Sequence, residues 1–418
     1  MVKKGKYYPM TITYIIMFKD QKQITVKRYT ESRENPNNIL TSELNNVPES
    51  VLAELPKIES LKRSIRGARS SRGFGPQPKS LRHLVIPDEF KTLDDGTPFL
   101  ISDTGADENE NRILMFSTPE NLKLLETCKH ILADGTFSAA PKLFTQLYSI
   151  HAQLGDETLP LVYFCLASKT EDTYRSALQL LKTAAPDFRP TTLMSDFEMS
   201  AIQAFCREFP DLKPTGCFYH LSQSVYRRIQ REGLTTAYGN DPDLSIYLRQ
   251  LCALAFLPED DVIDAFEETF STTHLDYDPR AQPIIEYFEE NYIGRYQLVA
   301  GQIIRDTPRF PVHLWNIHFR SLDDSGRTNN TVEAFHGKFN RLMVVVHPNL
   351  WRFIDVLKEA NGMVKNRILA RQMGEGPPPR KKVYRDCQKR IVNLLTKYLD
   401  GTNTRASTLR GLAYNFDF

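Results

Sequence analysis

The chain has 418 residues, 41% hydrophobic and 25% charged, which is typical of a folded protein of two or three domains. Its 53 basic and 51 acidic residues give a formal net charge of +2, which excludes a globally cationic nucleic-acid-binding protein. No apolar run approaches the roughly 20 residues that a membrane span needs, and the six scattered cysteines favour free thiols over a disulfide scaffold. Any DNA-binding charge must therefore be local.

The N-terminal part predicts a small module and a basic arm. Residues 1–56 are expected to form a strand-bearing segment that ends in a polar linker, and residues 57–125 lead from it into the next domain. Between Lys57 and Arg82, eight basic residues and one acid leave a local charge of +7 (8 − 1). This run predicts DNA contact or nuclear targeting, with a solvated arm as an equal alternative. Its candidate DNA contacts are Lys62, Arg63, Arg66, Arg69 and Arg72.

The first candidate site residue is Asp134, which follows the apolar run 130–133 and precedes Gly135. This pattern predicts a strand that delivers a carboxylate to a position with little steric cover. Two further apolar runs, at 143–153 and 159–168, are joined by a glycine-containing turn and predict antiparallel strands. Asp134 is therefore expected at the start of a three-stranded meander.

Asp196 repeats this arrangement, because it follows a short apolar strand and precedes a helical pattern. Three strands followed by helix, strand, helix, strand and helix is the element order of the ribonuclease H-like fold. That α/β fold has a mixed five-stranded sheet with flanking helices, and its acidic site lies on the first and fourth strands. Residues 126–235 are predicted to form its first part, with Asp134 and Asp196 on those two strands. The expected helices and strands after the meander span 173–185, 192–195, 199–209, 215–219 and 222–232.

Glu333 lies on a predicted helix, in which Val332, Phe335 and Phe339 recur at helical spacing. Residues 236–325, between the last strand and this helix, are predicted to form an α-helical insertion. Residues 326–372 would then complete the ribonuclease H-like domain.

The remaining residues, 373–418, predict a C-terminal helical segment after the proline-rich break GEGPPPRKK. Residues 350–371 and 383–399 are predicted to be helical, and we expect these helices to pack beside the ribonuclease H-like domain.

Three carboxylates from two strands and a helix match the needs of a two-metal site. Hard cations such as Mg²⁺ prefer oxygen ligands, and a pair of them roughly 3.5–4 Å apart can activate an attacking oxygen and stabilise a leaving one. Taken singly, each acid has an ordinary interpretation: Asp134 as a turn, Asp196 as a helix cap and Glu333 as a solvated side chain. The metal-site hypothesis rests on their combination.

The chain resembles the Mutator-like element (MULE) transposase family from about Pro87 to about Gly374. The matching stretches are RILMFSTPENLKLL, HILADGTFSAAPKLFTQLYSIHAQ, TLMSDFEMSAIQAF, GCFYHLSQSVYRRI and RTNNTVEAFHGKFN. The resemblance implies a DDE transposase domain in which Asp134, Asp196 and Glu333 hold two Mg²⁺ or Mn²⁺ ions. Water would cut at an element end, and the freed 3′-hydroxyl would attack target DNA. It also implies double-stranded DNA as partner, both terminal repeats and target, with a homo-oligomer and a nuclear location.

The same resemblance matches Cys217 and His220 to a Cys-x-x-His motif that follows the second aspartate. Two potential ligands do not complete a zinc site, which takes four. We favour a structural role, or a contact of His220 with DNA or the scissile phosphate, over zinc binding. The other histidines, such as His336 and His347, have no spacing that favours metal binding, and are predicted to be structural.

Basic and aromatic residues near these motifs are further candidates. Phosphates could be bound through charge-assisted hydrogen bonds, and a solvated helix face is an equal alternative for each basic residue. Trp315 is a candidate for stacking on an unpaired base, although its apolar neighbours favour a core position. The candidate phosphate contacts are Arg227, Arg228, Arg327, Lys338 and Arg341.

The chain departs from the family in one respect. Relatives commonly carry an N-terminal Cys/His zinc module, yet no cysteine precedes Cys128. The sequence therefore leaves two function classes open: an active transposase, favoured by the intact triad, and a domesticated derivative that binds DNA or partners without catalysis. An unrelated nuclease on the same fold is a third class, and it would hydrolyse DNA without joining strands.

Overall fold

The computed structural model describes Leu40, Glu59 and residues 78–155, 157–271, 278–299, 301–323, 326, 330–343, 348–376 and 381–418. The chain divides into two units, Met1–Pro78 and Lys79–Phe418, and the description below concerns the second. The predicted N-terminal strands, the candidate DNA contacts from Lys62 to Arg72, and Arg327 lie outside the described residues.

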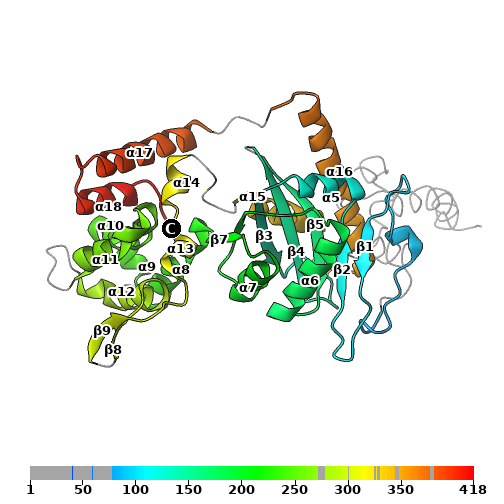
Figure 1. The fold of residues 1–418 in the computed structure, drawn as a ribbon, viewed down its shortest axis with the longest axis horizontal. Helices are drawn as coiled ribbons and strands as arrows, with labels where there is room; N and C mark the ends of the chain where they lie inside the picture. Colours follow the sequence, from blue (N-terminus) through cyan, green and yellow to red (C-terminus); the bar gives the residue numbers. More distant parts are fainter. Residues whose placement is uncertain are drawn as a thin grey trace, which may run out of the picture. The chain divides into compact units, whose positions relative to one another are not determined.

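A mixed sheet forms the centre of one lobe (Figure 1), with seven strands in the order β1-β2-β5-β4-β3-β6-β7. Neighbouring strands are antiparallel except at β3–β6 and β6–β7, which are parallel. This mixed α/β architecture with flanking helices is compatible with a ribonuclease H-like fold. The strands are β1 (Leu100–Asp103), β2 (Ile113–Phe116), β3 (His130–Thr136), β4 (Gln146–Leu154), β5 (Glu157–Leu166), β6 (Thr192–Ser195) and β7 (Lys213–Gly216).

The sheet has seven strands where the sequence predicted five. The five expected strands are present, and the additional pair β1–β2 comes from the lead-in to the domain and extends the sheet beside β5. A second correction concerns Asp134, which lies inside β3, because its backbone pairs with Ser149 and the strand continues to Thr136. Neither strand shows an alternating pattern, because β2 is buried at all four positions and β1 at none, and both were missed from the sequence.

Helices cover both faces of the sheet. Helices α6 (Glu171–Ala184) and α7 (Met199–Glu208) pack against one another in front of the sheet in Figure 1, and α15 (Asn330–Met343) lies behind it. The hydroxyl of Thr170 caps α6 by accepting a hydrogen bond from the backbone N–H of Thr173 at 3.3 Å. Helices α5 (Pro119–Glu126) and α16 (Leu350–Gln372) both contact β5, so the C-terminal part of the chain returns to the sheet.

A second lobe is mainly helical and has its own apolar core, which includes Phe256, Phe288 and Trp315. The segment predicted to be an α-helical insertion also contains a hairpin that the sequence did not predict, β8 (Tyr296–Val299) with β9 (Gln302–Arg305). The helices of this lobe are α8 (Phe218–Arg231), α9 (Thr235–Asn240), α10 (Pro242–Ala253), α11 (Val262–Phe270), α12 (Gln282–Phe288), α13 (Val312–Trp315), α14 (His318–Leu322), α17 (Lys382–Leu399) and α18 (Arg405–Ala413).

The last two helices pack in this second lobe. Helix α18 contacts α10 and α11, and α17 contacts α14 and α18. The two lobes are linked directly, because the half-buried Arg320 on α14 donates a hydrogen bond from Nη1 to the hydroxyl of Thr215 on β7 at 2.7 Å. No helix in the described part of the chain is long and apolar enough to cross a membrane.

Candidate active site

The parallel pair β3–β6 places the two aspartates side by side. Leu132 of β3 is in register with Met194 of β6, and each aspartate follows two residues later on its chain. Because side chains alternate along strands, Asp134 lies on the same face of the sheet as Leu132. Leu132 and Met194 form a small buried cluster with Val332 of α15. The residue after Val332 is Glu333, so this apolar contact brings the third acid to the two aspartates.

Burial and neighbouring charges raise the pKa of two of these carboxyl groups, Asp196 and Glu333. Burial, reinforced by the neighbouring charges of Asp134 and Glu198, raises the pKa of Asp196 to about 7. Burial and the charge of Asp134 also raise the pKa of Glu333. Since like charges that are close together resist joint ionisation, the arrangement stores electrostatic repulsion that a bound cation would relieve.

A chain of buried polar side chains leads to Asp134. Nδ1 of His336, one helical turn after Glu333 on α15, lies 3.6 Å from Oδ2 of Asp134. Nε2 of His336 lies 3.0 Å from the hydroxyl of Ser149, which lies 2.9 Å from Nε2 of His151. Asp134 and His336 are each 7% exposed, while Ser149 and His151 are 0% and 1% exposed. We call these four residues the relay. His336 is therefore part of the site, which corrects the sequence-based assignment of a purely structural role.

The hydroxyl of Ser149 determines how protons are distributed in the relay. Its single proton has three possible acceptors: Nε2 of His336, Nε2 of His151 and, at 3.5 Å, the backbone carbonyl of Asp134. Where Nδ1 of His336 directs a proton toward the Asp134 carboxylate, Nε2 of His336 can accept from Ser149. Ser149 can then accept from Nε2 of His151. Burial, with a smaller effect of His336, lowers the pKa of His151 well below its usual value, in keeping with a neutral ring.

The Cys-x-x-His motif lies at the predicted junction of a strand and a helix, but the strand ends and the helix begins a few residues earlier than predicted. Strand β7 ends at Gly216 and α8 begins at Phe218, so Cys217 precedes the helix and His220 lies in its first turn. Cys217 is fully buried, in keeping with a structural role. Nε2 of His220 lies 3.4 Å from Oε1 of Glu333, and burial lowers the pKa of His220 against the opposing effect of Asp134. His220 therefore lies among the acids.

Sequence reasoning did not single out two further residues at the site. Glu198 follows Asp196 by two positions, and its backbone N–H donates to Oδ1 of Asp196 at 3.3 Å. Its carboxylate pairs with Lys169 at 3.1 Å. The hydroxyl of Tyr148 on β4 is buried without a hydrogen-bond partner, and burial, together with the charges around it, raises its pKa. The sequence signal for Glu198 was its short spacing from Asp196, whereas nothing in the strand pattern of residues 143–153 distinguishes Tyr148 from its neighbours.

The donor atoms of the site suit a hard divalent cation. Oε1 of Glu333 is buried without a hydrogen-bond partner, and the three predicted ligands offer carboxylate oxygens whose mutual repulsion favours a positive charge between them. Within the described residues, however, no group of three or more His, Cys, Asp or Glu side chains is arranged to hold a metal ion. The carboxylate oxygens fit the predicted Mg²⁺ or Mn²⁺. The side chains that would bind these ions are, however, not yet arranged around a common point.

The other candidate contacts lie in different settings. Arg228 is already paired with Glu232 at 2.9 Å, whereas Arg227 is exposed and lines a cavity of about 340 Å³ beside α8. On α15, Lys338 and Arg341 are exposed. The indole of Trp315 is 1% exposed, and its N–H donates to the carbonyl of Phe310, so base stacking by Trp315 is excluded and its core position is confirmed.

A comparison with protein-family models matches residues 130–224 to the MULE transposase domain. The matched span runs from the start of β3 into α8, so it includes Asp134, Asp196 and His220, while Glu333 lies beyond it. A search among curated proteins finds no match to this chain. The resemblance predicted from the sequence is confirmed over residues 130–224, which match the MULE transposase domain, and the match does not extend over the rest of the predicted range from about Pro87 to about Gly374.

Proposed function

We propose that the chain is a MULE-type DNA transposase that cuts and joins DNA by metal-dependent phosphoryl transfer. One observation supports this proposal: the β3–β6 register and the apolar contact of Val332 bring Asp134 close to Asp196 and to Glu333, whose pKa values its charge raises, in and beside the span that matches the MULE transposase domain. On this proposal the fold is ribonuclease H-like, and residues 236–325 are an insertion between its fourth-strand aspartate and its glutamate helix.

The three acids would hold two Mg²⁺ or Mn²⁺ ions, which when bound supply charge for activating a nucleophilic oxygen and for stabilising the leaving oxygen. The chain's own residues do the rest. The relay fixes the orientation of the Asp134 carboxylate through His336. The side chains of His220 and Glu333 are 23% and 32% exposed, and Nε2 of His220 lies 3.4 Å from Oε1 of Glu333. On this proposal His220 contacts a phosphate oxygen held at the acids.

The proposal includes double-stranded DNA as substrate, both as transposon ends and as target, and a homo-oligomer that brings two ends together. A nuclear location and a Mg²⁺- or Mn²⁺-loaded form belong to the same proposal. Arg227, Lys338 and Arg341 are the candidate phosphate contacts that remain exposed near the site.

A domesticated protein that binds DNA without cutting it is the second candidate. The observation that favours it is the absence, among the described residues, of a preassembled group of metal ligands. The stored repulsion between the acids argues against it, since a protein without catalysis gains nothing from keeping these carboxylates together.

An assay of DNA strand joining distinguishes the candidate functions. A duplex with a pre-cut 3′-hydroxyl end and the flanking repeats would be incubated with a target plasmid, Mn²⁺ and the full chain. The proposal expects covalently joined products that disappear in Asp196→Asn. A nuclease would produce cut plasmid without joined ends. A domesticated protein would shift the mobility of the repeat duplex and yield neither product.

A further inference from the structure

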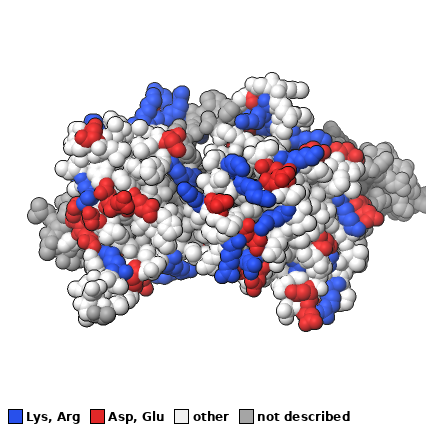
Figure 2. Space-filling view, in the orientation of Figure 1, with Lys and Arg blue, Asp and Glu red and all other residues white. Residues whose placement is uncertain are grey.

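A row of exposed cations follows one side of α17. Lys381, Arg385 and Lys389 are spaced four residues apart and are all exposed, so they lie above one another on the helix surface. The row continues through the exposed Asn393 to Lys397, which faces the carboxylate of Asp400. Figure 2 shows the resulting concentration of basic side chains over the N-terminal half of α17. We call Lys381, Arg385 and Lys389 the α17 row.

The α17 row does not stabilise the helix that carries it. None of its three cations forms an ion pair within the described part of the chain, and the first turn of α17 contains no acid. Cations near a helix N-terminus oppose the helix dipole, and like charges four residues apart repel each other. The only acid between 381 and 399 is Asp386, which is not in the row. An arrangement that costs stability in the isolated chain points to an anion supplied from outside.

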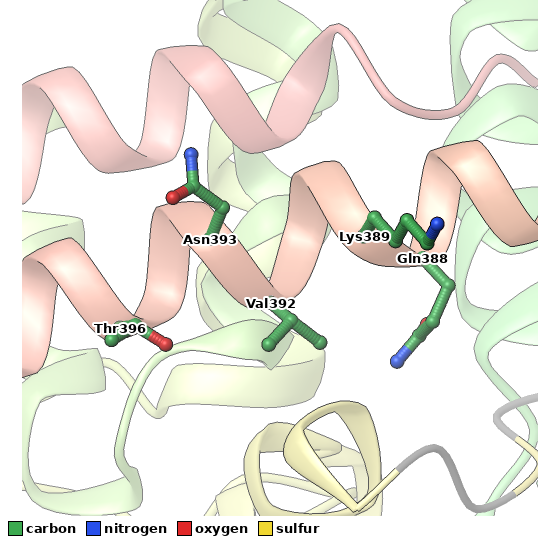
Figure 3. A pocket seen from close by; sticks show the side chains of 5 residues that line it. All are labelled: Gln388, Lys389, Val392, Asn393 and Thr396. Carbon is green, nitrogen blue, oxygen red and sulfur yellow. The ribbon is translucent and has the colours of Figure 1, made fainter.

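The opposite side of α17 is anchored firmly. Ile391 and Leu395 are buried in the core of the helical lobe, and the side-chain amide of Gln388 donates to the carbonyl of Ser321 on α14 at 2.7 Å. Figure 3 shows Val392 and Gln388 pointing toward α14, away from Asn393 on the other side of the helix. Beside Lys389 lies a depression of about 410 Å³, lined also by Val392, Asn393 and Thr396. The row is thus held on a fixed support and is open to solvent.

The dimensions of the row match one strand of a duplex. Eight residues of helix separate Lys381 from Lys389, which corresponds to about 12 Å at about 1.5 Å per residue. Since successive nucleotides of one DNA strand rise by about 3.4 Å, three cations over this length can face phosphates within about four nucleotides. The polar lining beside Lys389 adds hydrogen-bonding groups and no negative charge.

We propose that the α17 row is a docking surface for the phosphate backbone of duplex DNA. This inference rests on the proposed function in one respect, because it takes the docked duplex to be the DNA that reaches the acidic site. The surface lies on the lobe that also contains α8 and His220, so it extends the DNA-binding face beyond the MULE transposase domain.

The salt dependence of binding tests this inference. The full chain and the triple variant Lys381→Gln/Arg385→Gln/Lys389→Gln would be titrated with a labelled duplex in EDTA, which prevents cutting, over a series of KCl concentrations. Each lost phosphate contact lowers the slope of log K against log salt by about 0.9, so the triple variant is expected to lose about 2 to 3 from the slope. Glutamine keeps the helix propensity, and the melting temperature should stay unchanged or rise slightly.

A matched control removes three exposed cations that already have partners. Lys91, Arg295 and Lys365 pair with Asp88, Glu290 and Asp95, and their replacement by glutamine changes the net charge equally. This control should leave the slope within about 0.5 of the wild type.

Three results would overturn the inference: an equal loss of slope in both triple variants, an unchanged slope in the α17 variant, or no duplex binding by the wild type. Weakened binding to anionic vesicles or single-stranded RNA, with duplex binding unchanged, would also overturn it and assign the row to that partner. Failure of the wild type to cut DNA with Mn²⁺ would count against the proposed function alone, since the EDTA titration does not depend on cutting.

Discussion

Nδ1 of His336 lies 3.6 Å from Oδ2 of Asp134, and this contact joins α15 to β3 inside the candidate active site. The same helix carries Glu333 three residues earlier, so the contact that orients one acid also fixes the helix that delivers another. Ser149 and His151 hold the far side of the His336 ring. Asp134 is therefore positioned by a buried chain of polar contacts as well as by strand register.

Disrupting the relay should weaken metal binding by about 10- to 100-fold, the usual effect of removing a partner that orients a metal ligand. The variants are His336→Phe and Ser149→Ala, and Mn²⁺ affinity is measured by electron paramagnetic resonance at fixed pH. His336→Gln, which keeps an N–H donor, should recover part of the affinity. His318→Phe is the control, because His318 is equally buried and bonds to the carbonyl of Phe256 in the other lobe. Equal Mn²⁺ affinity in all variants and wild type would show that the relay serves stability alone.

The raised pKa of Asp196 predicts how metal-free stability depends on pH. The pKa is about 7 in the folded chain against an ordinary value of 3.8, so the folded state favours the protonated form. The stability from this group is complete below about pH 4 and is lost as pH rises through 7. The unfolding free energy in EDTA should fall by a few kcal/mol between pH 5 and 8, since each pKa unit corresponds to about 1.4 kcal/mol.

Asp196→Asn is the variant that tests this pH effect. In this variant the unfolding free energy should decrease less with rising pH, and at pH 8 without metal the variant should be more stable than the wild type. Mn²⁺ should stabilise the wild type more than the variant. Chemical denaturation at four pH values measures both effects. If the unfolding free energies of the two proteins changed with pH in parallel, Asp196 would not be the group that causes the pH dependence.

The substitution Gly135→Ala tests how tightly Gln146 packs against the strand residue next to Asp134. A Cβ there would lie 2.4 Å from Oε1 of Gln146, whose side chain is fully buried and hydrogen-bonded to the hydroxyl of Tyr174. Gly135→Ala should therefore cost about 1–3 kcal/mol of unfolding free energy. Gly362→Ala is the control: no atom lies within 4 Å of its added Cβ, so it should stabilise α16 by up to about 1 kcal/mol. If Gly135→Ala were as well tolerated as the control, Gln146 would have to be free to move.

Much of the site can be predicted from the sequence, because its aspartates occupy strand positions with strong local patterns. The apolar runs before Asp134 and Asp196 predict β3 and β6, and helical spacing around Glu333 predicts α15. The proximity of Asp134 to Asp196 follows only from the parallel register of Leu132 with Met194, which is a tertiary contact that local sequence does not indicate. Local sequence predicts the elements, while the pairing of distant segments decides which side chains meet.

The features that escape prediction depend on long-range packing. His336 joins the site because Ser149 of β4 and Asp134 of β3 lie opposite it, and no spacing in the sequence indicates that contact. The hairpin β8–β9 consists of two four-residue strands, too short for alternation to be distinguished from a helical pattern. The α17 row is different, because its four-residue spacing is visible in the sequence once the segment is known to be helical.

Metal-dependent cutting tests the central claim most directly. Duplex DNA carrying the flanking genomic repeats would be incubated with Mg²⁺ or Mn²⁺ and the wild type, Asp134→Asn, Asp196→Asn or Glu333→Gln, with DNA binding measured in parallel. We predict metal-dependent cleavage by the wild type and its loss in all three variants, with binding retained. Binding without cleavage by the folded wild type, or cleavage that survives in any of the three variants, would contradict the assignment of these acids as the active site.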